Sequence, residues 1–266
     1  MSIIKVENVH KTFGSGDTAV KVLQGVNFVV QKGETLCILG GSGGGKSTLL
    51  KVMIGAHDAT EGHVFIDGDD IVGMSEKGLN KVRRKFGVLF QSGALLNSMT
   101  VGQNVGLPIS FHTKQAPETI DIMVKVKLEQ VGLLEAKERL PSEISGGMQK
   151  RAGLARAVAL DPKIVFYDEP SAGLDPIATA VIDELINDFK KTMGMTNIVV
   201  THVMESVRRI ADKIVMLDKG KVILYGTLDD LLNSQDPKVM NFVRGEIDGD
   251  GADEEAQRRF VSDLLL

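Results

Sequence analysis

Apolar runs alternate with segments of helical periodicity along most of the chain. The runs that predict strands are SIIKVENV, VNFVVQKG, ETLCILG, EGHVFIDGDDI, KIVFYD, TNIVVT, DKIVMLD and KVILYG. ETLCILG is almost continuously apolar, which is typical of a strand covered on both faces. Helices are predicted from STLLKVMIG, from residues 176–191 and from MESVRRIA. This order predicts an α/β fold with a largely parallel sheet.

The pattern changes between about residues 100 and 160, where helices replace the alternation. In PETIDIMVKVKLEQVGLL the apolar residues recur every three or four positions, as on one face of a helix. We therefore expect a helical subdomain at about 92–160, within a domain that spans residues 1–235. Residues 236–266 depart from this pattern and form a C-terminal extension. In it, EIDGDGADEE predicts a flexible linker, and EEAQRRFVSDLLL is compatible with a short helix or a disordered terminus.

Composition and charge narrow the possible classes of function. The 266 residues are 43% hydrophobic and 25% charged, which is typical of a soluble globular protein. The net charge of −4 disfavours nucleic-acid binding through a broad basic surface. Cys37, the single cysteine, lies in a predicted buried strand, so a reducing compartment is expected. No leader is recognisable and no apolar run approaches the roughly 18 residues that span a bilayer, so we expect a cytoplasmic protein that reaches a membrane only through a partner.

A glycine-rich loop between a buried strand and a helix predicts a phosphate-binding site. GGSGGGKST fits the pattern G-x-x-x-x-G-K-[ST] through Gly40, Gly45, Lys46 and Ser47. Glycines let backbone N–H groups approach phosphate closely, and the helix N-terminus adds positive potential. We expect Lys46 to contact the β- and γ-phosphates and Ser47 to bind Mg²⁺. The candidate nucleotide-binding residues of this loop are Gly40, Gly41, Ser42, Gly43, Gly44, Gly45, Lys46, Ser47 and Thr48.

Polar side chains at the ends of other predicted strands can share this site. In KIVFYDEP the strand ends on Asp168, which suits the Mg²⁺ shell, and on Glu169, which can act as the base toward the attacking water. His202 can contact the γ-phosphate or orient that water, Gln91 can reach Mg²⁺ or the water, and Phe13 can stack on adenine. Each residue also has a structural alternative. Asp168 and Glu169 can be a solvated strand end, and His202 can be a structural histidine. Gln91 can cap a helix, and Phe13 can pack in the core.

These motifs together resemble those of the nucleotide-binding subunits of ABC transporters, over about residues 3–232. In the family's order they are Phe13, Walker A GGSGGGKST, Q-loop Gln91, signature ISGGM, Walker B IVFYDE, D-loop SAGLDP and switch His202. The resemblance implies a P-loop NTPase fold of the ABC ATPase type, with a mostly parallel core sheet, an antiparallel β subdomain and an α-helical subdomain. It also implies ATP and Mg²⁺ as ligands. Met148 stands where the commonest signature has Gln, and Phe13 where Tyr is frequent.

The family's roles carry over to single positions of this chain. The resemblance implies that Lys46 and Ser47 bind phosphate and Mg²⁺, and that Gln91 and Asp168 also bind Mg²⁺. It further implies that Glu169 is the catalytic base, that His202 is the γ-phosphate sensor, and that Asp175 in the D-loop communicates between protomers.

A second helix start rich in backbone donors, in SEISGGMQK, also has the character of a phosphate site. In the family two ATPase subunits form a head-to-tail homodimer, and the signature residues of one subunit close on the ATP of the other. The residues expected to act in trans are Ser145, Gly146, Gly147 and Met148.

Within the family, FQSGALLNSMTVGQNVGLPI and SGGMQKRAGLARAVALDP resemble the ATPases of Mla/MCE-type phospholipid transport systems. These systems maintain the lipid asymmetry of a Gram-negative outer membrane. The resemblance implies an integral membrane permease (MlaE-like), a periplasmic MCE protein (MlaD-like) and a small STAS-domain protein (MlaB-like). It places the chain on the cytoplasmic side of the inner membrane, held there by the permease.

Two other functions remain open from the sequence. Within the transporter class, the alternative is an importer ATPase for an amino acid or another small solute. The other is a non-transport ABC ATPase that acts on the ribosome or DNA, which the single cassette, the single cysteine and the absence of a long heptad array disfavour.

Two regions are predicted to contact other subunits. Residues 92–105 link the Mg²⁺ side of the site to the helical subdomain, so we expect them to transmit motion to the permease, with Leu95 and Leu96 facing its cytoplasmic helix. We expect the segment after Gly245 to dock on the partner protomer or another subunit, so that its deletion weakens assembly.

Overall fold

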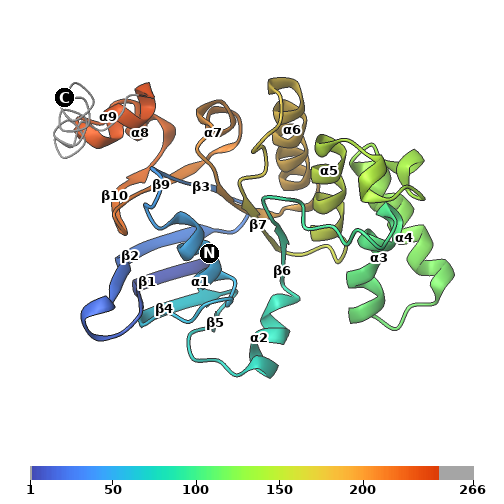
Figure 1. The fold of residues 1–266 in the computed structure, drawn as a ribbon, viewed down its shortest axis with the longest axis horizontal. Helices are drawn as coiled ribbons and strands as arrows, with labels where there is room; N and C mark the ends of the chain where they lie inside the picture. Colours follow the sequence, from blue (N-terminus) through green and yellow to red (C-terminus); the bar gives the residue numbers. More distant parts are fainter. Residues whose placement is uncertain (1, 246–266) are drawn as a thin grey trace, which may run out of the picture.

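A six-stranded sheet forms the centre of the protein (Figure 1). The computed structural model describes residues 2–245. In sheet order the strands are β10 (Lys221–Gly226), β9 (Lys213–Asp218), β3 (Thr35–Gly40), β8 (Thr196–Val200), β7 (Ile164–Asp168) and β6 (Phe86–Leu89). All neighbouring pairs are parallel except β10 with β9. The predicted α/β class with a mostly parallel core sheet is confirmed.

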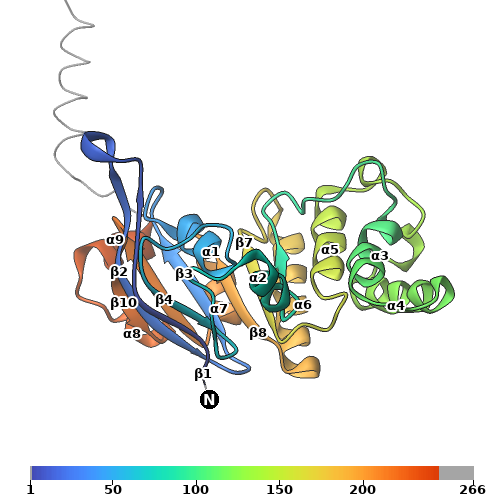
Figure 2. The same ribbon diagram turned by 90° about the horizontal axis from the view of Figure 1, so that it is seen from below.

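A second, four-stranded antiparallel sheet lies beside the central one (Figure 2). In sheet order its strands are β2 (Val20–Gln31), β1 (Ser2–Phe13), β4 (Glu61–Ile66) and β5 (Asp69–Asp70). Helix α1 (Lys46–Met53) packs between the two sheets, because Leu49 and Met53 are fully buried in one cluster with Ile4 of β1 and Ile38 of β3. The antiparallel sheet thus covers one face of the central sheet through α1.

Helices cover the other face of the central sheet. Along β3, Leu36 and Ile38 face α1, whereas Cys37 and Leu39 belong to the opposite cluster, as the two-residue period of a strand requires. That cluster includes buried residues of α6 (Pro176–Met193) and α7 (Met204–Ile210). Burial raises the pKa of the Cys37 thiol, which keeps it protonated and unreactive. The continuous apolar run of β3 therefore reflects cover on both faces.

Three helices form the end of the molecule farthest from the antiparallel sheet (Figure 2). They are α3 (Val101–His112), α4 (Pro117–Gln130) and α5 (Gly146–Ala157), and they pack on one another. Thr100 begins α3 with a capping box, in which the Thr100 Oγ1 accepts from Gln103 N (3.2 Å) and Gln103 Oε1 accepts from Thr100 N (2.9 Å). These helices lie in the region that the sequence predicts to be helical.

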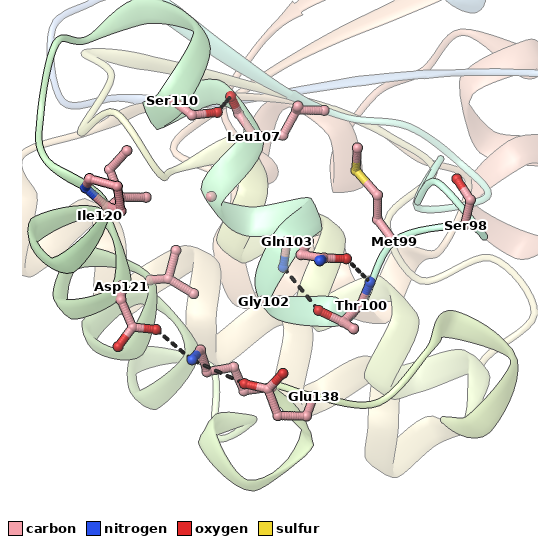
Figure 3. A pocket seen from close by; sticks show the side chains of 14 residues that line it. Ser98, Met99, Thr100, Gly102, Gln103, Leu107, Ser110, Ile120, Asp121 and Glu138 are labelled. Atoms are coloured by element: carbon pink, nitrogen blue, oxygen red, sulfur yellow. Dashed lines mark hydrogen bonds and ion pairs between the residues drawn. The ribbon is translucent and has the colours of Figure 1, made fainter.

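A hollow of about 560 Å³ opens between α3 and α4 (Figure 3). Gly102 and Gly106 line it from α3, and Ile120 and Asp121 from α4. Lys137 Nζ lies 2.5 Å from Asp121 Oδ1 and 3.1 Å from Glu138 Oε1, which neutralises charge at its rim. None of the predicted nucleotide-binding residues lines this hollow.

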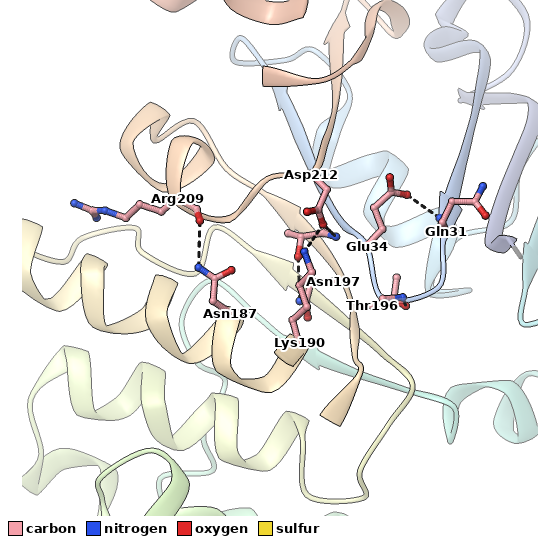
Figure 4. A network of polar contacts seen from close by, with 10 residues as sticks. Gln31, Glu34, Asn187, Lys190, Thr196, Asn197, Arg209 and Asp212 are labelled. Carbon is pink, nitrogen blue, oxygen red and sulfur yellow. Dashed lines mark hydrogen bonds and ion pairs between the residues drawn. The ribbon is translucent and has the colours of Figure 1, made fainter. Parts of the chain in front are cut away.

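A network of polar contacts holds the amino ends of the central strands (Figure 4). Thr35 N donates to Asp212 Oδ2 (2.6 Å), and Lys190 of α6 forms an ion pair with the same carboxylate. Asn197 donates through Nδ2 to Thr35 Oγ1 (3.2 Å) and accepts at Oδ1 from the hydroxyl of Tyr167 (3.2 Å). Because this edge is occupied by structural contacts, the opposite, carboxyl edge is the one available for a ligand.

Three helices were not predicted from the sequence: α2 (Glu76–Arg83), α8 (Leu228–Leu232) and α9 (Pro237–Arg244). Asp236 caps α9 by accepting from Lys238 N (2.9 Å), and Val239 is fully buried against the core. The first part of the predicted C-terminal extension is therefore a packed helix. The predicted linker, the terminal helix and the segment removed by deletion after Gly245 lie outside the described residues.

Within residues 2–245, no helix has both the length and the apolar character needed to cross a membrane.

Candidate nucleotide-binding site

Four neighbouring parallel strands bring the predicted site residues to one edge of the sheet. Gly40 ends β3, Asp168 ends β7, Gln91 follows β6 by two residues, and His202 follows β8 by two residues. The chain order of these strands is β3, β6, β7, β8, whereas their order in the sheet is β3, β8, β7, β6. The carboxyl ends of parallel strands meet at the same edge, where ligands bind in open α/β sheets.

The backbone of the loop after β3 can be formed only by glycine at two positions. Gly40 has φ 144°, and a Cβ there would lie 2.2 Å from the carbonyl oxygen of Leu217. Gly45 has φ 102° as the N-cap of α1, and a Cβ would lie 3.0 Å from the carbonyl oxygen of Val22. The sequence signal of repeated glycine thus has a steric cause.

Lys46 lies across this loop. Its Nζ donates to the carbonyl oxygens of Gly40 (2.7 Å) and Gly41 (2.9 Å). Burial lowers the pKa of the Lys46 ammonium, and the carboxylates of Glu169 and Asp168 act in the opposite direction. The lysine is therefore held where an anion in the loop would attract it.

The remaining residues of the loop face solvent or a shallow hollow. Ser42 and Ser47 are exposed, and Thr48 is half-buried on the first turn of α1. A hollow of about 340 Å³ is lined by Gly41, Ser42, Gly43 and Gly44, by the turn between β9 and β10, and by α9. Ser47, on the first turn of α1, is therefore accessible from solvent.

Glu169 and His202, predicted from separate strands, are in contact. His202 Nδ1 lies 3.0 Å from Glu169 Oε1, with hydrogen-bond geometry, and 2.9 Å from Oε2. Oε2 is buried and has no partner that meets the angular criteria of a hydrogen bond. The backbone of Glu169 has φ 48°, a strained conformation for a residue other than glycine. His202 therefore holds the carboxylate of Glu169 at the edge of the sheet that carries the phosphate loop.

Asp168 precedes Glu169 at the end of β7 and is half-buried. Burial raises the pKa of its carboxyl, the Glu169 carboxylate raises it further, and the ammonium groups of Lys51, Lys150 and Lys46 lower it. A cation placed beside these two carboxylates would relieve their mutual repulsion.

The loop that carries Gln91 is fastened to α5. Lys150 Nζ donates to the carbonyl oxygen of Gln91, and Arg156 donates to those of Gly93 (2.8 Å) and Ala94 (2.7 Å). Gly153 lies between them on the helix, and a Cβ there would lie 3.0 Å from the Gly93 carbonyl oxygen.

The sequence analysis did not identify Lys150, Gly153 or Arg156. Their spacing of three residues, on a helix that starts at the signature, is a signal that could have found them.

The signature residues lie at the start of α5, where Ser145 and Gly146 are exposed and Met148 packs against the core. Ser145 is the N-cap of this helix, with Oγ accepting from Met148 N (3.3 Å), and both Ser145 and Gly146 are exposed. A Cβ at Gly146 would have no neighbour within 4 Å, and one at Gly147 would lie 3.7 Å from Ala178. The start of the helix is therefore open to a ligand from outside the chain.

Asp175 has a local structural contact in addition to its predicted role. It is the N-cap of α6, and its Oδ1 accepts from Ile177 N and Ala178 N, both at 2.9 Å. Ile177 beside it is 79% exposed, which is unusual for a large apolar side chain. Asp175 therefore fixes the turn that presents an apolar surface next to the signature residues.

Comparison with known proteins identifies the family. The sequence pattern described as ABC transporter matches residues 23–172, more than half of the chain. The chain belongs to the ABC transporter family. It is 44% identical to the intermembrane phospholipid transport system ATP-binding protein MlaF of Haemophilus influenzae, over 93% of this chain and 92% of that protein. It is 41% identical to the probable ribonucleotide transport ATP-binding protein mkl of Mycobacterium leprae, over 91% of this chain and 69% of that protein.

The fold comparison agrees with the family. The dimeric, post-hydrolysis structure of the ATP-binding cassette MJ0796 bound to ADP and Pi matches with a TM-score of 0.79 and 33% identity, over 85% of this chain and 98% of that one. The predicted P-loop fold of the ABC ATPase type is confirmed. As an ATPase of an ABC transporter, the chain binds and hydrolyses ATP and works with membrane-embedded partners.

Phe13 lies at the end of β1 in this ABC ATPase and is 39% exposed. Its ring packs edge-on against His57, with centroids 5.5 Å apart, and Lys11 Nζ lies 4.9 Å from its centroid. The ring is outside the core and offers part of its surface to a ligand.

An apolar groove of about 640 Å³ lies between β6 and the helices α3 and α5. Phe90, Phe111 and Leu160 line it, and of residues 92–105 only Ala94 does. Leu95 instead packs against the core, and Leu96 lies outside the groove and is 43% exposed. Leu95 and Leu96 therefore do not line this groove, and their expected contact with a permease stays a prediction.

Proposed function

We propose that this chain powers phospholipid transport between the inner and outer membranes, which maintains outer-membrane lipid asymmetry. The observation that carries the proposal is the 44% identity to MlaF over 93% of this chain. That likeness spans nearly the whole of both proteins, so it includes surfaces outside the common ATPase motifs. We further propose that the chain lies on the cytoplasmic side of the inner membrane, held there by a permease.

The nucleotide site supports assigned roles for its residues. Lys46 holds the β- and γ-phosphates, and the loop glycines donate backbone N–H groups to them. Phe13 stacks on adenine. Glu169 accepts the proton of the attacking water at its buried Oε2, and His202, held by the same carboxylate, contacts the γ-phosphate.

Mg²⁺ fits the oxygen donors of this site. Ser47, Gln91 and Asp168 would hold it together with phosphate oxygens, and it would neutralise charge on the β- and γ-phosphates. Among residues 2–245 no group of three or more His, Cys, Asp or Glu side chains could hold a metal ion. The ion would thus depend on few protein ligands and on the nucleotide itself.

We propose that two copies of the chain form the active ATPase. The exposed signature residues Ser145 and Gly146 support this arrangement. The N–H groups at a helix start attract an anion, and the ATP of a second copy would supply one. Exposed Ile177 provides apolar surface nearby. In this dimer Ser145, Gly146, Gly147 and Met148 of one copy contact the ATP of the other, and Asp175 lies at the interface.

The apolar groove supports a permease partner of the MlaE type. Phe111 is 81% exposed on α3 and Phe90 is 42% exposed, so a cytoplasmic helix of the permease would bury both. A STAS-domain protein of the MlaB type and a periplasmic MCE protein of the MlaD type would complete the complex. We propose no contact with nucleic acid.

Phe111→Asp should weaken binding of the permease by about thirtyfold, the effect of losing a central aromatic anchor of an interface. Hydrolysis of ATP by the isolated subunit should be unchanged, because the side chain is exposed and lies outside the nucleotide site. The measurement is recovery of the permease with the tagged subunit from detergent-solubilised membranes. Ile122→Asp is the matched control, because Ile122 is also exposed and apolar but lies on α4, outside the groove. This variant should retain the permease. Equal recovery with both variants would contradict the assignment of the groove.

Reconstitution of the tagged complex, purified from its own membranes, tests the substrate class. ATP-dependent movement of a labelled phospholipid between proteoliposomes and acceptor vesicles is expected, and a complex with Glu169→Gln should show none. Uptake of a labelled ribonucleotide or amino acid without lipid movement would favour the small-solute alternative. The ribonucleotide arm is included because of the 41% identity to mkl.

A further inference from the structure

Lys150 is a buried lysine of α5 that contacts the loops carrying Gln91 and Glu169. Only 6% of the residue is exposed, although it lies one turn from the exposed start of α5. Its Nζ donates to the carbonyl oxygen of Gln91 and to that of Glu169 (3.2 Å). Burying an ammonium is costly unless such contacts compensate, so the position requires a reason.

The two carbonyl groups belong to the two loops that would surround the γ-phosphate. At Glu169, the carbonyl oxygen also accepts from Ala172 N (3.1 Å), and the N–H donates to Val200 O (2.9 Å). A residue at φ 48° keeps that conformation only where several contacts enforce it. Lys150 is one of these contacts, and it joins the strained residue to the loop of Gln91.

The same helix connects these loops to the other nucleotide of the dimer. Ser145 begins α5 and, in the proposed dimer, contacts the ATP held by the partner, whereas Lys150 contacts the site of its own chain. The two residues lie five positions apart on one rigid helix. A displacement of α5 at either end is therefore transmitted to the other end.

We propose that Lys150 is a positioning residue that sets Gln91 and Glu169 in its own chain's site and couples that site to the signature contact made with the partner's ATP. The inference rests on the proposed dimer for the coupling, but the positioning of Glu169 does not depend on it. The carboxylates of Glu169 and Asp168 favour the charged form of the lysine, although burial lowers the pKa of its ammonium. The contacts of Lys150 are with the backbone carbonyl groups of Gln91 and Glu169, so it is a positioning residue and not a catalytic group.

The first test compares single variants of the full chain. Lys150→Met keeps the length of the side chain and removes its donors, so kcat for ATP should fall by about tenfold to a hundredfold. The Kd for ATP should change by less than about threefold, because the lysine does not contact the phosphate loop. Lys150→Arg retains charge and donors and should recover most of kcat.

Lys127→Met is the matched control. Lys127 is also buried, 5% exposed, and pairs with Asp161 away from the nucleotide site. Its replacement should lower the thermal stability without changing kcat. If Lys150→Met loses the native fold, Lys150→Gln takes its place throughout. A kcat within twofold of wild type, or a loss that Lys150→Arg does not reduce, would overturn the positioning role.

The second test separates the two sites with mixed dimers, in which Glu169→Gln silences one site. In the first dimer, one chain carries Lys150→Met and the other Glu169→Gln, so the active site contains the altered lysine in its own chain. In the second, one chain carries both changes and the other is wild type. The active site then belongs to the wild-type chain, and the altered lysine lies on the signature helix that the other chain contributes to it. Coupling predicts that both are slower than a reference dimer with Glu169→Gln alone.

The outcomes distinguish the parts of the inference. Slowing of only the first mixed dimer would overturn coupling and leave positioning, and slowing of neither would overturn both. An inactive reference dimer would show that silencing one site stops the other, which is itself coupling within the dimer, and the single variants would then decide the positioning role.

Discussion

Glu169→Gln is expected to reduce ATP hydrolysis by about a hundredfold to ten-thousandfold, because it removes a general base and keeps the size of the side chain. In the proposed mechanism the carboxylate of Glu169, which His202 Nδ1 contacts at 2.9 Å through Oε2, takes the proton. Glutamine places a neutral amide there, so ATP should still bind and the ATP-bound dimer should accumulate. Steady-state turnover, nucleotide affinity and size-exclusion chromatography with ATP measure these three effects.

Lys46→Ala provides the contrast for this prediction. Lys46 lies across the phosphate loop, where its Nζ donates to the carbonyl oxygens of Gly40 and Gly41, so its loss should abolish ATP binding and dimer formation together. Undiminished hydrolysis by Glu169→Gln would show that another group activates the water. His202, whose Nδ1 lies 3.0 Å from the same carboxylate, would then be the next candidate.

The sharing of each site between two chains predicts opposite results for two mixed dimers that carry the same lesions. With Lys46→Ala on one chain and Ser145→Arg on the other, one site keeps both intact halves, and about half of the wild-type activity is expected if the two sites turn over independently. With both lesions on one chain and a wild-type partner, each site has one damaged half, and no activity is expected. ATPase assays of the two purified mixed dimers give the comparison.

A wild-type dimer purified through the same pair of tags is the control, and each lesion alone should inactivate a homodimer. Because cooperation between sites can slow a lone intact site, the deciding quantity is which mixed dimer is active rather than its rate. Activity only in the dimer with both lesions on one chain would refute shared sites.

The local pattern of the sequence determined the strands, the phosphate loop and the residues at the strand ends. The nearly continuous apolar run ETLCILG predicted β3 as a strand covered on both faces, and shorter apolar runs predicted β7 and β8. Once a parallel sheet is predicted, its carboxyl edge brings together Lys46, Glu169 and His202, and the contact of Glu169 with His202 follows that expectation.

Only the tertiary structure decided which polar side chains turn inward and which apolar ones stay exposed. Lys150 resembles any surface lysine in the sequence, but the approach of α5 to two loops buries it on the carbonyl groups of Gln91 and Glu169. Likewise, Phe111 of α3 lines the apolar groove, whereas Leu95 and Leu96 do not. The two contacts of Lys150 join residues that lie 59 and 19 positions apart, and their geometry depends on how whole elements pack, which no local periodicity records.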